Sequence, residues 1–187
     1  VYKDERLEQI QGESGVKLLP VSEPDAAVTA KMLAAAPDQI NRSSARTFLQ
    51  EVLKDPAATP DDRVMAQMGL AAAGEPVLLD ITRMLEEPTL TAAQKLYLGV
   101  GLAKLGDFTG AEKVYASLGG QIVAEGDLKY VETGGTFDER VQNTAAALML
   151  TSITSNPDAD ALMRYLNLQN TNRRASTTVL YNLEQLA

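Results

Sequence analysis

The chain has 187 residues, of which 45% are hydrophobic and 5% aromatic, and its formal net charge at pH 7 is −8. This length suits one domain with a substantial core, and the negative charge argues against nucleic acid or an anionic membrane as partner because both would repel it. Without cysteine or histidine, the chain can form no disulfide or thiolate site, and it lacks the commonest general base and transition-metal ligand.

The first 21 residues are interrupted by glycines and by Pro20, so we expect residues 1–21 to form a tether or a short strand near Val16. Residues 22–187 form one helical domain in this interpretation. The sequence opens at Val1 without an initiator methionine or a signal-peptide pattern, so we expect a segment of a longer protein. No apolar run approaches the roughly 20 residues that span a bilayer, and we expect no membrane insertion by this segment.

Apolar residues recur at three- and four-residue spacing along most of the chain, which is typical of amphipathic helices. Alanine and leucine dominate the apolar set, and few aromatic residues accompany them, which favours packed helices over sheets. Prolines and glycines mark where the periodic segments stop. The pattern predicts helices over 25–36, 43–54, 60–74, 76–86, 91–106, 108–118, 139–154, 157–168 and 175–187.

Several of these helices have recognisable starts. Thr59 precedes Pro60, and this order favours a helix start because threonine caps free amides and proline fits the first turn. Thr91 and Gln94 have the spacing of a capping box. Asn156, which also precedes a proline, is a further predicted cap.

Residues 121–132 break the helical pattern. Two short runs with β propensity, 121–125 and 128–132, flank Gly126 and Asp127, a pair that is typical of a tight turn. We therefore expect a two-stranded β insertion near 121–132 in an otherwise all-α chain.

The segment from residue 96 to residue 118 partly fits the tetratricopeptide pattern. Leu98, Gly99, Ala111 and Tyr115 fall at its signature spacing. Other signature positions do not match, and the match does not recur about 34 residues away, as a true tetratricopeptide array requires.

A looser repeat does recur. Residues 69–74 (GLAAAG) align with 101–106 (GLAKLG) one helix pair later, and a third copy runs from 145 to 166. The unit is an antiparallel helix pair with an inner helix of small apolar residues and a more mixed outer helix. Such pairs cannot bury their apolar faces alone and must stack, so we expect stacked antiparallel helix hairpins in an open superhelix, a ring or an irregular bundle.

Residues 142–150 (QNTAAALML), 156–166 (NPDADALMRYL) and 176–187 (STTVLYNLEQLA) resemble an inner helix, an outer helix and the next inner helix of the alpha-macroglobulin thioester domain. That domain is an α/α toroid, a fold also found in terpenoid cyclases and protein prenyltransferases, and it has a short stranded segment between helix pairs. The resemblance covers about residues 90–187 and implies an α/α toroid or part of one. Small residues at 144–147 would allow inner helices to approach closely.

The reactive bond of that family requires a Cys-x-Glu-Gln stretch. The sequence has no cysteine, so these residues cannot form a thioester and cannot capture a target covalently. Two Leu-Glu-Gln stretches, at 7–9 and 183–185, match part of the pattern, and we interpret both as chance.

The other candidates for chemistry are better explained by structure. Asp61 and Asp62 lie in the first turn of a predicted helix, where acidic groups favour the helix dipole, and Glu86 and Glu87 lie beside Pro88 at a helix end. Asp158 and Asp160 flank a helix start and lack the EF-hand pattern for calcium. The glycine pairs lack a phosphate-binding motif, and the aromatic residues are expected in the core or at its edge. We assign no catalytic, cofactor-binding or metal site. The residues considered are Asp61, Asp62, Glu86, Glu87, Asp158, Asp160, Gly119, Gly120, Gly134, Gly135, Tyr130, Phe137, Tyr165, Arg173 and Arg174.

We interpret the chain as a non-enzymatic domain with a structural or protein-binding role in a larger exported or cell-surface protein that resembles alpha-macroglobulins. One alternative is an open tetratricopeptide-like adaptor, expected in the cytoplasm, that binds a peptide or protein in its concave face. Another is a toroid-type enzyme acting on sugars or prenyl chains, which the absence of histidine and of a clustered acid pair disfavours. We expect no cofactor, and a protein or peptide as the partner.

Overall fold

The computed structural model describes residues 11–12, 15–17 and 23–172. Helices dominate these residues and a short antiparallel hairpin interrupts them, which confirms the prediction of an all-α fold with a two-stranded insertion. None of the described helices is long and apolar enough to cross a membrane. The helix expected over 175–187 lies outside the described residues. The chain divides into two compact units, Val1–Met84 and Leu85–Ala187.

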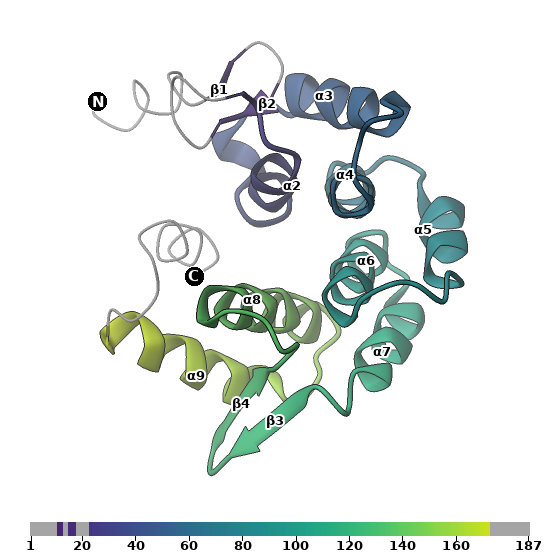
Figure 1. Ribbon diagram of the computed structural model, residues 1–187. Helices are drawn as coiled ribbons and strands as arrows, with labels where there is room; N and C mark the ends of the chain where they lie inside the picture. The colour runs from purple at the N-terminus through teal and green to yellow at the C-terminus, as the bar shows by residue number, and fades with distance from the viewer. Residues whose placement is uncertain (1–10, 13–14, 18–22, 173–187) are drawn as a thin grey trace. The chain divides into compact units, whose positions relative to one another are not determined.

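The first unit consists mainly of helices, preceded by two very short strands (Figure 1). Its elements are β1 (Gln11–Gly12), β2 (Gly15–Val16), α2 (Ala26–Ala35), the 3₁₀ helix η1 (Pro37–Gln39), α3 (Arg42–Lys54), α4 (Pro60–Ala72) and α5 (Leu78–Leu85), which ends at the boundary between the units.

Helix α4 packs against both α2 and α3. A Cβ atom on Gly69 would lie 2.5 Å from Cδ1 of Leu49 in α3 and 2.8 Å from Cβ of Ala30 in α2. These distances are far shorter than the roughly 3.5–4.0 Å at which carbon atoms attract each other. Glycine at this position therefore lets α4 approach both neighbours.

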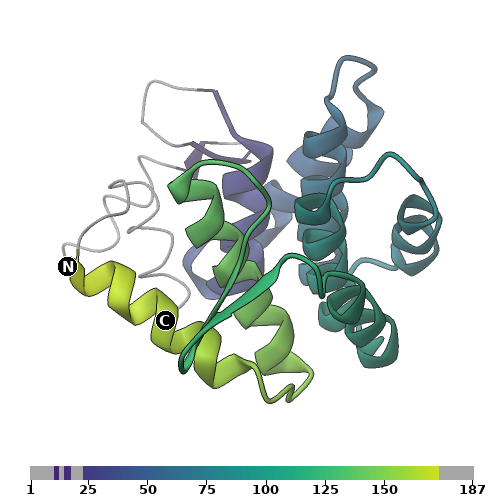
Figure 2. The same ribbon diagram turned by 60° about the horizontal axis from the view of Figure 1, so that its bottom comes forward.

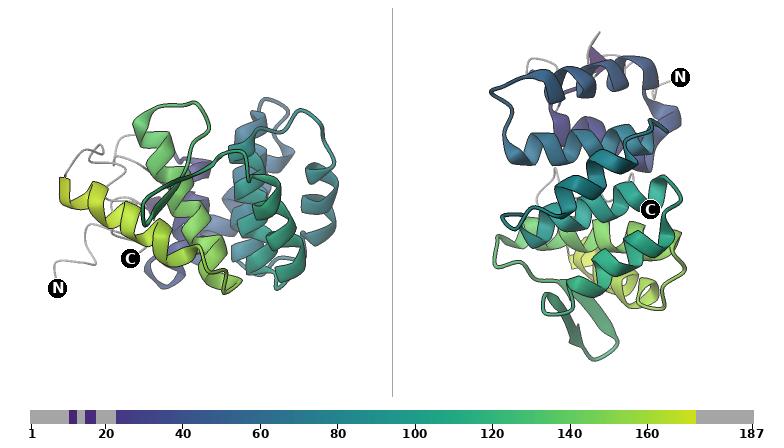
Figure 3. Two further views of the ribbon diagram at one scale, coloured as in Figure 1. Left: turned by 90° about the horizontal axis from the view of Figure 1, so that it is seen from below. Right: turned by 90° about the vertical axis from the view of Figure 1, so that its right-hand side faces the viewer.

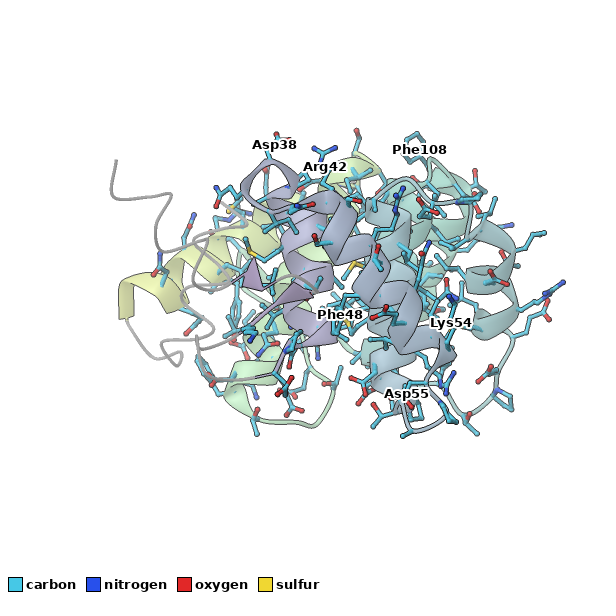
Figure 4. All side chains as sticks on the ribbon, turned by 90° about the horizontal axis from the view of Figure 1, so that it is seen from above. Asp38, Arg42, Phe48, Lys54, Asp55 and Phe108 are labelled. Carbon is cyan, nitrogen blue, oxygen red and sulfur yellow. The ribbon has the colours of Figure 1, made fainter. Side chains whose placement is uncertain are left out.

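Strand β2 is fixed to the helices by two hydrogen bonds and one close contact, and one of these bonds runs from the N–H of Asp25, the N-cap of α2, to the carbonyl of Val16 at 2.9 Å. The N–H of Val16 donates to Oγ1 of Thr29 in α2 at 2.9 Å, and both residues are buried. The Phe48 side chain of α3, labelled in Figure 4, lies where a Cβ atom on Gly15 would be 2.8 Å from its Cδ1 atom.

The second unit has a hairpin between two helix pairs, as Figure 2 shows from a second direction. Helix α6 packs against α7 and α8, and α8 also packs against α9. Gly99 of α6 allows α6 to approach both α7 and α8 closely. A Cβ atom there would lie 2.8 Å from Cδ1 of Leu150 in α8 and 2.9 Å from Cγ1 of Val114 in α7. The elements are α6 (Ala92–Lys104), α7 (Phe108–Ser117), β3 (Ile122–Glu125), β4 (Leu128–Val131), α8 (Phe137–Ile153) and α9 (Ala159–Asn172).

Helix α8 contains the run of small residues that was expected to face other helices. Thr144 and the three alanines that follow it are all buried, as are Leu148 and Leu150. The prediction that this segment faces the interior is confirmed.

Helices α4, α6 and α8 begin in the same way. Each has a threonine N-cap in a complete capping box, in which the cap side chain and the third residue of the helix satisfy each other's backbone amides. Thr136 caps α8, which therefore starts at Phe137 and not at the predicted Glu139. The boxes pair Thr59 with Asp62, Thr91 with Gln94 and Thr136 with Glu139.

The same three helices also end alike. The N–H groups of the two residues after each C-cap donate back to carbonyls of the last turn, and the first of these two residues has positive φ. This is the pattern of the Schellman motif. Gly74 (φ 85°) and Gly106 (φ 84°) hold this position after α4 and α6, and Ser155 (φ 57°) holds it after α8. These shared ends extend the repeat that the sequence indicated.

Two further helix starts differ from the prediction by two residues each. Helix α9 starts at Ala159 and not at Pro157, because Oδ1 of Asn156 accepts the N–H of Asp158 at 3.0 Å and closes a turn ahead of the helix. Helix α5 also starts later than predicted, at Leu78, after a tight turn in the preceding residues.

Candidate functional site: the β3–β4 hairpin and its anchors

The hairpin between α7 and α8 closes at the predicted tight turn. Gly126 has φ 63° and Asp127 has no positive φ, which is the pattern of a type II′ turn with glycine in the first central position. The strands pair antiparallel, with Val123 opposite Tyr130 and Glu125 opposite Leu128. The hairpin concentrates polar and aromatic side chains from strands and helices in one place, so we treat it as the candidate site.

An ion pair anchors the hairpin to the start of α9. Lys129 of β4 pairs with Oδ1 of Asp158, and Oδ2 of the same carboxylate accepts the hydroxyl of Tyr115 in α7 at 3.0 Å. Burial, together with the charge of Asp158 and this hydrogen bond, raises the pKa of Tyr115. The phenol therefore stays protonated near neutral pH and is unsuited to act as a base.

An aromatic stack fixes the opposite face of β4. The rings of Tyr130 and Tyr165 are stacked with centroids 4.8 Å apart, and the Arg140 guanidinium lies 5.4 Å from the centroid of the Tyr130 ring. Arg140 also forms an ion pair with Glu132. A cation over an aromatic face contributes about 0.5–1 kcal/mol or more when partly desolvated, so this group adds to the stability of the hairpin.

The tyrosine hydroxyls of this stack are also unsuited to proton transfer. The hydroxyl of Tyr130 donates to Oε1 of Glu125 at 2.8 Å, and this hydrogen bond raises the pKa of Tyr130. Burial raises the pKa of Tyr165. Both groups therefore remain neutral hydrogen-bonding and packing groups at physiological pH.

Main-chain atoms of the hairpin are held as well. The N–H of Val131 donates to Oγ1 of Thr144 in α8 at 3.0 Å, and this hydroxyl donates to the carbonyl of Arg140 at 2.7 Å. At the turn, Nε of Arg164 donates to the carbonyl oxygen of Asp127 at 3.1 Å. Val131 and Thr144 reproduce the bond between Val16 and Thr29, which has the same separation of 13 residues. The hairpin is thus fixed from its turn to its base.

The acidic residues singled out in the sequence have separate positions. Asp62 closes the capping box of α4, accepting the N–H of Thr59 at 3.1 Å, and Asp61 lies in the same first turn. Glu86 and Glu87 are exposed after α5. Of the pair near α9, Asp158 anchors the hairpin and Asp160 lies in the first turn. Within the part of the chain that the structure describes, no group of three acidic residues is placed to hold a metal ion.

The glycine pairs lie on the two connections of the hairpin, Gly119–Gly120 after α7 and Gly134–Gly135 before α8. Of the aromatic residues considered together, the structure brings Tyr130 into contact with Tyr165, whereas Phe137 begins α8. Arg173, Arg174 and the two Leu-Glu-Gln stretches lie outside the described residues.

Sequence reasoning missed the charged anchors. Lys129 and Asp158 are 29 positions apart, and Tyr115 and Asp158 are 43 apart, so no local pattern joins them. The only available signal was the strand assignment itself, which places Lys129 and Tyr130 on opposite faces of β4.

Comparison with known proteins found no matching family model, no matching curated protein and no matching solved structure. The resemblance to alpha-macroglobulins is therefore a prediction that depends on the quoted residues alone.

Proposed function

We propose that this chain is a non-enzymatic helical domain with a structural or protein-binding role, and that it belongs to a larger exported or cell-surface protein of the alpha-macroglobulin type without thioester chemistry. The observation that carries this proposal is that the polar side chains around the hairpin bind one another and hold the hairpin on the helices. Lys129, Asp158, Tyr115 and Arg140 are engaged in holding β3 and β4 on the helices.

The arrangement of elements supports the proposed relationship. Residues 142–150 lie within helix α8, residues 156–166 form a turn and the first part of helix α9, and the hairpin separates two helix pairs. These are the positions that the resemblance to a toroid implies for the same sequence segments. A chain without cysteine would keep the supporting role of such a domain and lose its covalent chemistry.

An open tetratricopeptide-like adaptor is the second candidate, and one observation favours it. Ala111 and Tyr115, two of the residues at signature spacing, are buried, and Gly99 allows close approach of α6 to Val114 in α7. In this alternative the chain would bind a separate protein or peptide in the cytoplasm.

Cross-linking of the native protein in intact cells distinguishes the two candidates. Lysine-reactive cross-links analysed by mass spectrometry are expected to connect this segment mainly to β-rich parts of its own polypeptide at the cell surface or in the medium. Cross-links that join it only to other cytoplasmic proteins would contradict the proposal and favour the adaptor.

A further inference from the structure

Strand β3 is the outer strand of the hairpin. Strand β4 packs against α8 and α9, and Figure 1 shows it between these helices and β3. The right-hand view of Figure 3 shows the hairpin extending past the helices of its unit. The free edge of β3 therefore faces away from α8 and α9, whereas the corresponding edge of β4 is bonded to α8 through Thr144.

The hydrogen-bond pattern of the hairpin determines which backbone groups point outward. The residues that flank a two-residue turn exchange hydrogen bonds, and bonded pairs then alternate with non-bonded pairs, so Glu125 bonds to β4. The bond from the N–H of Glu132 to the carbonyl of Gln121, at 2.8 Å, has the same phase. Ile122 and Ala124 lie in the non-bonded pairs between, so their N–H and C=O groups point away from β4. No described residue bonds to these groups.

We propose that this edge of β3 is an association surface for a second copy of the chain, which adds its own β3 antiparallel to the first. The result is a four-stranded sheet in the order β4, β3, β3, β4. An exposed strand edge is a template for such pairing because only another extended backbone matches its row of donors and acceptors. This inference goes beyond the proposed function and does not depend on it.

The edge is complementary to itself in one register. With a two-fold axis through Val123, Ile122 of one copy lies opposite Ala124 of the other as a hydrogen-bonded pair. Each pair exchanges two N–H···O bonds, so every outward backbone group of both residues is satisfied. The Val123 side chains of the two copies lie opposite each other, and such a cross-strand pair of apolar side chains stabilises antiparallel strands. A shift by one residue would point these groups the wrong way.

Side-chain charges agree with this register. Glu125 lies opposite Gln121 of the second copy, whose amide can donate to the carboxylate, and not opposite another carboxylate. The two turns, each carrying Asp127, lie at opposite ends of the sheet, so the acidic tips are kept apart. The net charge of −8 per chain still opposes association and is screened by salt, so we expect the dimer to be favoured at high ionic strength.

Sedimentation equilibrium over a wide range of protein concentration and salt tests the proposal. The wild-type mass is expected to rise from 20.1 kDa toward twice that value as concentration and salt increase. Ala124→Pro is expected to abolish the rise, because proline removes an outward N–H and leaves the bonds between β3 and β4 intact. Near-ultraviolet circular dichroism of the Tyr130–Tyr165 stack checks that the hairpin persists, and Ala124→Ser, which keeps the N–H, is the matched control.

Two substitutions at one position test the register. Gln121→Lys is expected to strengthen association by pairing with Glu125 of the second copy, and Gln121→Glu is expected to weaken it. Thr47→Lys, at an exposed position of α3, controls for the change in net charge. A wild-type mass of one chain under all conditions overturns the proposal, whether or not the edge binds another protein. So does association that is unaffected by Ala124→Pro, or equal effects of the two Gln121 variants.

Discussion

Gly69→Ala tests whether the small residue on α4 is what allows α2 and α3 to pack against it. On helix propensity alone, alanine in place of a mid-helix glycine stabilises a protein by about 0.5–1 kcal/mol. In α4 the new methyl group would lie 2.5 Å from Cδ1 of Leu49 and 2.9 Å from the backbone Cα of Ala30. Packing and propensity therefore predict changes of opposite sign.

The size of the stability change in Gly69→Ala depends on whether the residues that contact the new methyl group can move away. The leucine methyl can change rotamer, but Ala30 can retreat only if α2 moves with it. Overpacking a filled core costs about 1–3 kcal/mol, and contact with backbone places Gly69→Ala in the upper part of that range. After the propensity gain, we expect a net loss of about 1–2 kcal/mol. Gly99→Ala meets only side-chain atoms, at 2.8 Å and 2.9 Å, so its loss is expected to be smaller.

Urea unfolding followed by far-ultraviolet circular dichroism measures these changes. Ala72→Gly, at the last residue of the same helix and only partly buried, gives the propensity reference, with an expected loss of at most about 0.5 kcal/mol because the glycine penalty is largest in the middle of a helix. A Gly69→Ala variant that is as stable as the wild type, or more stable, would refute the reasoning.

Three further substitutions concern helix ends and an anchor. Ser155→Gly is expected to stabilise the protein by about 0.5–1 kcal/mol in thermal unfolding, because φ 57° strains a residue with a side chain; a loss of stability would contradict this. Hydrogen bonds from Thr136 lower the pKa of Glu139, so the ionised carboxylate contributes to stability above the unfolded pKa of about 4.3, and this contribution is lost as pH falls through the lower folded pKa. When unfolding is measured over this acid range, the stability advantage of the wild type over Glu139→Gln is expected to shrink as pH falls. A difference that stays constant would argue against this role of Glu139. Tyr115→Phe removes a hydrogen bond to a carboxylate and should cost about 1.5–3 kcal/mol at neutral pH. The raised pKa of Tyr115 makes the wild type lose stability above about pH 10, because the unfolded chain gives up the phenol proton first. The difference in stability between the wild type and Tyr115→Phe should therefore become smaller above this pH. A difference that becomes larger would show that the phenol is not held neutral.

The helices were predictable because their signals are local. The helix starts at Thr59 and Thr91 and the glycines that end α4 and α6 are signals that can be read from a few neighbouring residues. The small residues of α8 are read from the sequence in the same way. The start of α9 was wrong because Asn156 caps a turn and not the helix itself. A difference of two residues in where the helix starts cannot be read from the capping residue alone.

The anchors of the hairpin were not predictable for a different reason. Lys129, Asp158 and Tyr115 come from three elements that meet only after α7, α8 and α9 have packed. The division of the chain after Met84 is equally hidden, since the helices on either side share the same composition and the same caps. Such features depend on long-range packing, to which sequence periodicity is insensitive.

The sequence that flanks Val1 and Ala187 in the intact gene product, read from the gene and matched to the mass of the native protein, tests the proposed role most directly. The account predicts an export signal and β-sandwich segments around this helical domain. Further helix pairs with the tetratricopeptide signature, and no export signal, would contradict it.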